Sequence, residues 1–306
     1  MKERRGRLSR FVSGEYKAFG RPLSSTGKSR VLPGRPFFAL AFRHDLDGME
    51  QGDLDKFIDL HQAWTGGSTD FVLPGQFKRW RSNSARLLAL DHEIALHSEA
   101  RPRLMLGNPQ ATRILEGQYR RRLVNQIFKA EHYSGLPLAG HAPHDVNNYL
   151  PFDASTTWEI IGQATLKTGL AYVADYEGAS RTPSGTDRFP LPSPPYLRVR
   201  GEHRVVVLPV GWDDKFFWAS WADRNLKGWG RDFLDRTLDE AWASLESQLE
   251  ACREKRRPLV VNLHPYWFVR GALPTWELKQ RALEWAAREG VAVLKHMDMA
   301  ARAAGI

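Results

Sequence analysis

The residues of this chain that could do chemistry are aspartates and histidines that end or follow short apolar runs. Asp45 and Asp47 follow the run 37–42, and His97 ends the run 93–97. Further runs lead to similar residues, which are His141 with His144, Asp213 with Asp214, and His264. One such residue is usually a turn residue or a helix N-cap, but five run ends with the same residue types favour a shared site. Aspartate and histidine side chains together suit a divalent ion such as Zn²⁺.

The spacing of the two aspartates after the first run allows them separate roles. Asp45 and Asp47 are two residues apart, so they point to the same side of an extended chain. One carboxylate can then bind a metal ion while the other acts as a base. His92 begins the run that His97 ends, about 16 Å away at ~3.3 Å per residue, and is interpreted as a structural or surface residue.

The elements that must position these residues alternate between apolar runs and helical patterns. Runs typical of strands occur at 37–42, 69–73, 93–97, 136–141, 170–173, 259–264 and 291–294, with a hairpin over 196–210. Helical patterns occur between them, at 53–64, 77–90, 109–133, 156–167, 232–255 and 274–289. This alternation predicts an α/β protein with parallel strands, in which the site lies at the C-terminal strand ends.

The number of units favours one barrel over two small domains. About seven or eight strand–helix units fit a single distorted (β/α) barrel of about seven strands. A doubly wound open sheet is the alternative, but no glycine-rich phosphate-binding motif follows any expected strand. We therefore expect a barrel over 36–306 and a basic, irregular N-terminal arm over 1–35.

Composition and charge restrict the class of protein and its partners. The chain has 306 residues, a net charge of +9 and 42% hydrophobic residues, which is typical of a soluble globular protein. No run approaches the ~18 apolar residues of a membrane helix, and no apolar signal segment follows the basic start, so we expect a cytoplasmic protein without a transmembrane segment. The basic runs carry no nucleic-acid-binding motif, so we expect no nucleic acid partner and peripheral contact of the arm with anionic surfaces.

Two further features of the sequence have a structural interpretation beside the functional one. Cys252 is the single cysteine, and we interpret it as a small core residue of a helix, which excludes a disulfide within the chain. The aromatic-rich segment 212–229 either provides sugar-stacking faces or a lid beside the site, or forms a hydrophobic plug over the barrel mouth.

This set of motifs resembles the polysaccharide deacetylase family, also called carbohydrate esterase family 4 or NodB-like. The segment 42–48, Phe-Arg-His-Asp-Leu-Asp-Gly, is similar to the family's Thr-Phe-Asp-Asp-Gly segment in the His-Asp-x-Asp form of divergent members. The family's other motifs are matched, in the same order, by 91–98, 140–144, 208–214 and 261–265. The resemblance extends over residues 36–300 and implies a (β/α) barrel hydrolase.

The resemblance implies a role for each matched residue. Asp45 is implied as the catalytic base, with Asp47 and His97 as ligands of a divalent metal, for which Zn²⁺ is our choice. His264 is implied as the general acid, and Asp213 is expected to orient His264 or to bind a sugar hydroxyl.

Two positions depart from the family pattern. The second histidine of the family's His-Ser/Thr-x-x-His motif would stand at position 101, which is Arg101. We therefore choose His141 as the third metal ligand, with His144 as the second choice. His141 also stands where the family has an arginine that pairs with the base, and Arg43, next but one to Asp45, is a candidate to compensate.

The motifs together predict a metal-dependent carbohydrate N-deacetylase, which hydrolyses the acetamide of an N-acetylated sugar in a polysaccharide or glycolipid. In the expected mechanism, Asp45 accepts the proton of a metal-activated water and His264 protonates the departing amine. Candidate substrate contacts are Arg43, His144 and Trp212. Two alternatives keep the fold: a glycan-binding protein whose metal site has decayed, and another C–N hydrolase that cleaves a cyclic amide without metal.

Overall fold

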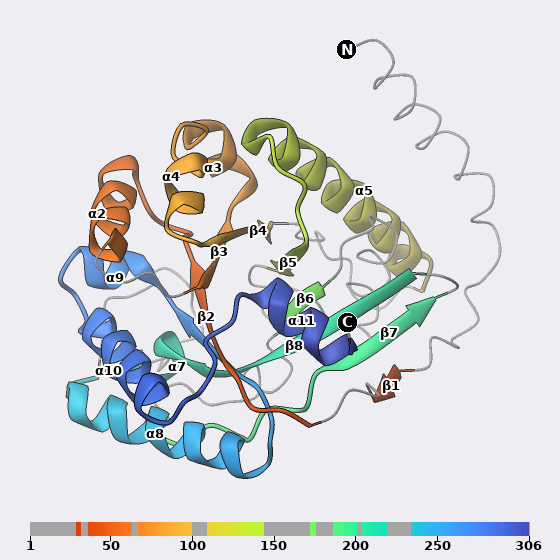
Figure 1. Ribbon diagram of the computed structural model, residues 1–306. Helices are drawn as coiled ribbons and strands as arrows, with labels where there is room; N and C mark the ends of the chain where they lie inside the picture. Colours follow the sequence, from red (N-terminus) through yellow and green to blue (C-terminus); the bar gives the residue numbers. More distant parts are fainter. Residues whose placement is uncertain are drawn as a thin grey trace.

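The fold is a closed ring of parallel strands with helices around it (Figure 1). The computed structural model describes residues 29–31, 36–62, 67–99, 109–143, 172–175, 186–200, 203–218 and 234–305. The ring contains β2 (Leu40–Asp45), β3 (Ser68–Val72), β4 (Glu93–Ser98), β5 (Gly140–Pro143), β6 (Tyr172–Asp175), β8 (His203–Asp213) and β9 (Leu259–Leu263). Each strand pairs in parallel with the next, and β9 pairs with both β8 and β2, which closes the ring. The predicted (β/α) barrel is confirmed.

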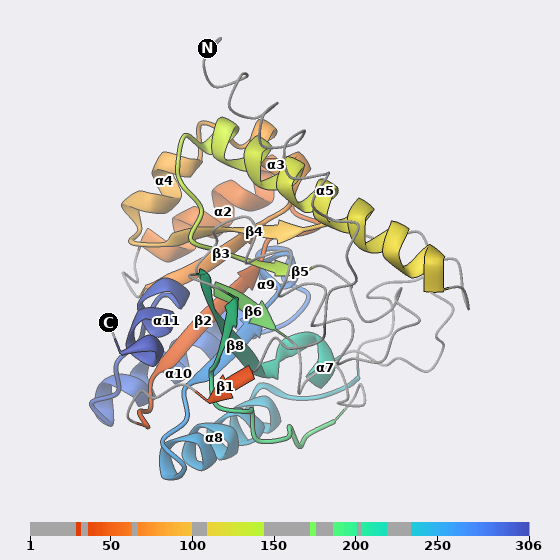
Figure 2. The same cartoon turned by 90° about the vertical axis from the view of Figure 1, so that its right-hand side faces the viewer.

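Two of the described strands lie outside the ring, in the order β8, β7, β1 from the ring outwards (Figure 1 and Figure 2). The strand β7 (Tyr196–Arg200) runs antiparallel to the first part of β8, as the predicted hairpin requires. The short strand β1 (Ser29–Val31) runs antiparallel to β7. The region 1–35 therefore contains one strand rather than being irregular throughout, and the rest of this arm lies outside the described residues.

The described helices surround the ring, and all but α11 lie around its outside (Figure 1). They are α2 (Gln51–Gln62), α3 (Pro74–Arg79), α4 (Ser84–Ala89), α5 (Pro109–Ser134), α7 (Asp214–Trp218), α8 (Leu238–Glu254), α9 (Pro265–Val269), α10 (Thr275–Arg288) and α11 (His296–Ala304). One apolar cluster includes Leu54 of α2 and Leu123 of α5. A second includes Leu245 of α8 and Leu278 of α10. Among the described helices, none is both long and apolar enough to cross a membrane.

Small and aromatic side chains fill the ring interior. Ala41, Phe71, Ala95 and Tyr172 come from four different strands and share one buried cluster. Strands that are buried on both faces read as continuous apolar runs, which is why the sequence pattern locates most of the ring.

Helix α11 covers the end of the ring at which the strands begin. The backbone N–H of His296 donates to Thr69 Oγ1 at 2.9 Å, and that of Met297 donates to Glu93 Oε2 at 2.9 Å. Met299 of α11 belongs to the interior cluster. Because α11 closes this end, the C-terminal strand ends are left to carry a site.

Several predicted elements differ from the structure in their bounds or in kind. The strand predicted over 37–42 is β2 at Leu40–Asp45, and the one predicted over 136–141 is β5 at Gly140–Pro143. The helix predicted over 77–90 is two helices, α3 and α4, joined by a turn. The last predicted strand, 291–294, makes only an isolated bridge between Val293 and Leu40. The helix predicted from 232 begins at Leu238, because Thr237 caps it by accepting from the Glu240 N–H. The helix predicted over 156–167 lies outside the described residues.

Candidate active site

The C-terminal strand ends bring together four of the predicted residues. Asp45 ends β2, His97 lies near the end of β4, Asp213 ends β8, and His264 directly follows β9. All four are buried. Because β2 pairs with both β3 and β9, side chains from the two ends of the chain meet around Asp45.

Asp45 is held by a two-pronged contact with Arg43. Arg43 Nε donates to Asp45 Oδ1 at 2.7 Å, and Arg43 Nη2 donates to Oδ2 at 2.9 Å. Burial alone would raise the pKa of Asp45, but the charges of Arg43 and His264 hold it below its ordinary value. Asp45 is therefore a carboxylate at every pH of interest. Arg43 thus pairs with the base, as predicted for a compensating arginine. It is fully buried, so it has no exposed surface for the predicted contact with a substrate.

Asp47 and His97 lie beside this carboxylate. His97 Nε2 is 3.7 Å from Asp45 Oδ2 and 4.0 Å from Asp47 Oδ1. His97 Nδ1 contacts the carbonyl oxygen of Ala142 at 3.2 Å, so Nδ1 carries the proton and Nε2 presents its lone pair. Asp47 is the most exposed of the group, with 17% of its side chain accessible. His97 Nε2 and Asp47 Oδ1 are therefore two donor atoms that lie beside the Asp45 carboxylate.

His264 is oriented by Asp214, which corrects our expectation for Asp213. Asp214 Oδ1 is 2.6 Å from His264 Nδ1, and Asp214 Oδ2 accepts the backbone N–H of His264 at 2.7 Å. Burial lowers the pKa of His264, but Asp214, Asp213 and Asp45 outweigh that effect and raise the pKa to about 9. His264 therefore carries a proton at neutral pH, and its Nε2 lies 3.9 Å from Asp45 Oδ2.

Asp213 lies at the predicted strand end but contacts Phe216 and Asn262 instead of His264. Its Oδ1 accepts the backbone N–H of Phe216 at 3.1 Å at the start of α7, and its Oδ2 accepts from Asn262 Nδ2 at 2.7 Å. Asn262 Nδ2 also lies 3.2 Å from Asp45 Oδ2. Asn262 is a site residue that the sequence reasoning missed, although it stands two residues before His264 and so on the same side of an extended chain.

His141 is on the opposite face of its strand from the site, which corrects its choice as a metal ligand. The register pairs His141 with Leu96 and pairs Ala142 with His97. Paired residues of neighbouring strands point to the same face, so His141 shares the face of Leu96, which packs in an outer apolar cluster. The contact of 3.4 Å between His141 Nδ1 and Ser98 Oγ agrees with this placement.

Trp212 also faces outwards and is not placed to contact a substrate. Its indole is fully buried between β8 and α8, where Nε1 donates to Ser244 Oγ at 3.2 Å. Phe217 and Trp218 pack with it in the same cluster. The described part of the aromatic segment is thus core packing. Residues 219–233 lie outside the described residues, as do His144 and Arg101.

Comparisons with known proteins agree with this architecture. No protein family model matches the chain, and no curated protein matches it in sequence. Among solved structures, a Mycobacterium smegmatis protein assigned to the polysaccharide deacetylases superposes with a TM-score of 0.62 at 18% identity, over 90% of this chain and 93% of that one.

Two further structures are nearly as similar. The Puue allantoinase has a TM-score of 0.57 at 16% identity, over 93% of this chain and 97% of that one. A Pseudomonas aeruginosa protein assigned to the polysaccharide deacetylases has a TM-score of 0.57 at 15% identity, with the same coverage. The chain therefore has the fold of the NodB-like polysaccharide deacetylases, the family that its motifs resemble.

Proposed function

We propose that this protein is a metal-dependent hydrolase that removes the acetyl group from an N-acetylated sugar of a polysaccharide or glycolipid. The observation that carries the proposal is that Asp45 Oδ2 and His264 Nε2 lie 3.9 Å apart, with Arg43 paired to the carboxylate and Asp214 paired to the imidazole. These partners lower the pKa of Asp45 and raise that of His264. Amide hydrolysis needs a base that is free to accept a proton and an acid that still holds one. Surroundings that lower the pKa of one group and raise that of the other mark the first group as the base and the second as the acid.

Asp47 and His97 are the residues that would hold the metal ion. Two ligands of a tetrahedral zinc ion lie about 3.3–3.5 Å apart. Asp47 Oδ1 and His97 Nε2 are 4.0 Å apart, so a small side-chain rotation brings them to that spacing. A carboxylate oxygen and a neutral imidazole nitrogen are also the donor types that zinc takes. A divalent ion held here supplies Lewis-acid chemistry at the acetamide carbonyl.

The chain's own residues perform the proton transfers. Asp45 Oδ2 accepts the proton of the attacking water, while Arg43 holds the carboxylate in one orientation through Nε and Nη2. His264 Nε2 then donates its proton to the departing amine nitrogen. Asp214 stabilises the imidazolium until that moment through its contact with Nδ1. Asn262 keeps Asp213 and Asp45 at a fixed spacing by contacting both.

Acetate release tests the proposal. The zinc-loaded chain should release acetate and an equal amount of free amine from an N-acetylglucosamine oligomer, and removal of zinc with a chelator should stop the release. A zinc-loaded, folded chain that releases no acetate from any N-acetylated sugar tested would overturn the proposal.

Two alternatives rest on specific observations. Of the three expected metal ligands, the structure brings together Asp47 and His97 but turns His141 away, which favours a glycan-binding protein with a decayed metal site. In that case, the chain purified without chelator should contain no stoichiometric divalent metal.

The likeness to an allantoinase favours a metal-free C–N hydrolase acting on a cyclic amide. Such an enzyme would open a ring and release no acetate.

A further inference from the structure

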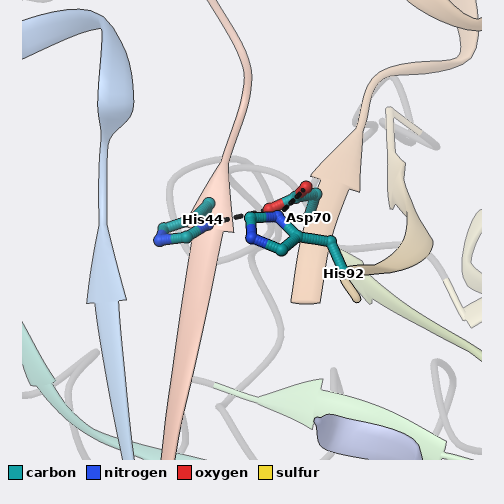
Figure 3. A group of neighbouring side chains, drawn as sticks. All are labelled: His44, Asp70 and His92. Carbon is teal, nitrogen blue, oxygen red and sulfur yellow. Dashed lines mark hydrogen bonds and ion pairs between the residues drawn. The ribbon is translucent and has the colours of Figure 1, made fainter. Parts of the chain in front are cut away.

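The strand that leads to Asp47 is fixed from its outer face. His44 directly precedes Asp45, so its side chain leaves β2 on the face opposite to the candidate active site. Figure 3 shows that His44 and His92 both point toward Asp70. His44 Nδ1 is 2.8 Å from Asp70 Oδ1, and His92 Nδ1 is 2.7 Å from Asp70 Oδ2. These buried contacts tie the end of β2 to β3 and to the start of β4, so the position of Asp47 depends on the loop that follows.

The loop 46–50 carries Asp47 from the end of β2 to the start of α2, and its first residue is held by two neighbouring elements. The backbone N–H of Leu46 donates to the carbonyl oxygen of Phe71 in β3 at 3.0 Å. Gln76 of α3 is buried, and its Nε2 donates to the carbonyl oxygen of Leu46 at 2.8 Å. The residue before Asp47 is therefore fixed on both of its backbone groups.

Arg270 holds the residue after Asp47. Gly48 has a φ of +75°, a left-handed conformation that glycine adopts without strain, so the chain turns sharply at this point. Arg270 Nη2 donates to the carbonyl oxygen of Gly48 at 3.0 Å and to Asp53 Oδ2 at 2.6 Å. Asp53 Oδ2 also accepts the backbone N–H of Glu50 at 3.0 Å. One guanidinium therefore closes the turn between β2 and α2.

The same arginine belongs to the helix that follows the proposed general acid. His264 is the N-cap of α9, and Arg270 is its C-cap. The guanidinium carbon of Arg270 lies 5.8 Å from the centroid of the Tyr266 ring. That ring lies against Gly48, where an added Cβ would be 3.7 Å from Tyr266 Cδ1. The helix that starts at the proposed acid thus holds, at its other end, the turn that carries the proposed metal ligand.

The position of this turn matters for the arrangement of the candidate ligands. Asp45, Asp47 and His264 each offer one ligand atom, and these three atoms lie within 4.8 Å of one another. Asp47 Oδ1 also lies 4.0 Å from His97 Nε2. Metal affinity depends on the groups that orient the ligands as well as on the ligands themselves. A displaced turn at Gly48 would move the Asp47 carboxylate away from these partners.

We propose that Arg270 is a positioning residue for Asp47, which it holds in place to bind a divalent metal ion. This inference rests on the proposed function, in which Asp47 and His97 hold that ion. Arg270 acts through the Gly48 carbonyl and Asp53, and it has no part in the proton transfers. It is 47% exposed, and exposed ion pairs contribute little to global stability, so its loss should leave the fold intact.

Zinc affinity tests this inference without the use of a substrate. Metal-free chains are titrated with zinc in competition with a chromogenic chelator. Arg270→Ala removes both contacts of the guanidinium, so its Kd for zinc should be about 10-fold or more above that of the unaltered chain. Arg86→Ala is the matched control, because Arg86 is 42% exposed and also pairs with an aspartate of α2, Asp55, but this partner lies inside the helix rather than at the turn. The control should bind zinc as the unaltered chain does.

Hydrogen exchange of the metal-free chains shows whether the effect is local. In Arg270→Ala the segment 46–50 should exchange faster than in Arg86→Ala, while β3 should exchange equally in both.

The inference is overturned if Arg270→Ala binds zinc as tightly as Arg86→Ala, or if its affinity falls without faster exchange in 46–50. It is also overturned if Arg270→Ala does not fold while Arg86→Ala does, or if the unaltered chain binds no zinc. Acetate release has no part in this experiment. A chain that shows the expected zinc affinities but releases no acetate would therefore contradict the proposed function and leave the role of Arg270 standing.

Discussion

At the scale of the residue, the candidate site sets two titratable groups in opposite states. Arg43 keeps Asp45 ionised, and Asp214 keeps His264 protonated. Their nearest atoms are separated by 3.9 Å, so each also stabilises the charge of the other. The proposed reaction begins from this arrangement and needs no prior proton transfer between the two groups.

The pH dependence of the reaction follows from His264. Activity requires its protonated form, so kcat/KM should fall as the pH rises through the His264 pKa of about 9. Asp214→Asn removes the largest charge that raises this pKa, so the falling limb should move to lower pH. The pH profile of acetate release by both chains checks this. A falling limb at the same pH in both chains would show that His264 is not the group that titrates.

The sequence predicts which strand ends carry the site but not which side chain of each end faces it. Asp45, Asp47 and His97 are near each other, as the strand-end pattern predicts. His141 and Trp212 face outwards. Side chains alternate between the two faces of a strand, so an assignment that is wrong by one residue reverses the direction. The register with the neighbouring strand decides which side chain faces the site, and this register cannot be read from the sequence alone.

At the scale of the element, close contacts between strands fix the shape of the ring. Gly140 of β5 lies against the ring of Tyr172 of β6, where an added Cβ would be 2.2–2.3 Å from the aromatic carbons. Tyr172 is itself held by its hydroxyl, which donates to Glu93 Oε1 at 2.8 Å. The tyrosine is fully buried and has no room to move aside.

Gly140→Ala should therefore destabilise the protein by about 3 kcal/mol or more, because the new methyl group overpacks a rigid contact. The matched control is Gly52→Ala in α2, where nothing lies within 4 Å of the added Cβ. Its free energy of unfolding should be unchanged or slightly higher, since alanine favours a helix over glycine. Urea unfolding of both variants measures the difference. Equal stability of the two variants would contradict the packing at Gly140.

Long periodic patterns are the elements that the sequence predicts best. The helix predicted over 109–133 is α5, Pro109–Ser134, and the one predicted over 274–289 is α10, Thr275–Arg288. The sequence pattern does not predict the short helix α11, because this helix is held by contacts with Thr69 and Glu93 from distant strands. Tertiary contacts of this kind leave little trace in a local pattern.

At the scale of the whole molecule, buried neutral histidines tie stability to pH. Burial lowers the pKa of His44, His141 and His296 to about 3, and lowers that of His61 well below 6.5. The unfolded chain takes up protons on these groups below pH 6.5, while the folded chain does not. Their contribution to stability is therefore full above pH 6.5 and is lost as the pH falls.

The free energy of unfolding should thus fall by about 3 kcal/mol or more between pH 6.5 and pH 5. The raised pKa of Glu93 opposes part of this fall, since that group gains a proton more readily in the folded chain. Urea unfolding at several pH values measures the slope. A stability that is flat over this range would mean that the buried histidines take up protons in the folded protein.

The most direct test of the account is the turnover of Asp45→Asn. The substitution keeps the size of the side chain and removes its ability to accept a proton, so acetate release from an N-acetylglucosamine oligomer should fall by about 10²-fold or more while the zinc content stays unchanged. Asp239→Asn is the matched control, because Asp239 is exposed and paired with Arg281, and it should retain full turnover. Undiminished acetate release by a folded, zinc-loaded Asp45→Asn chain would contradict the account.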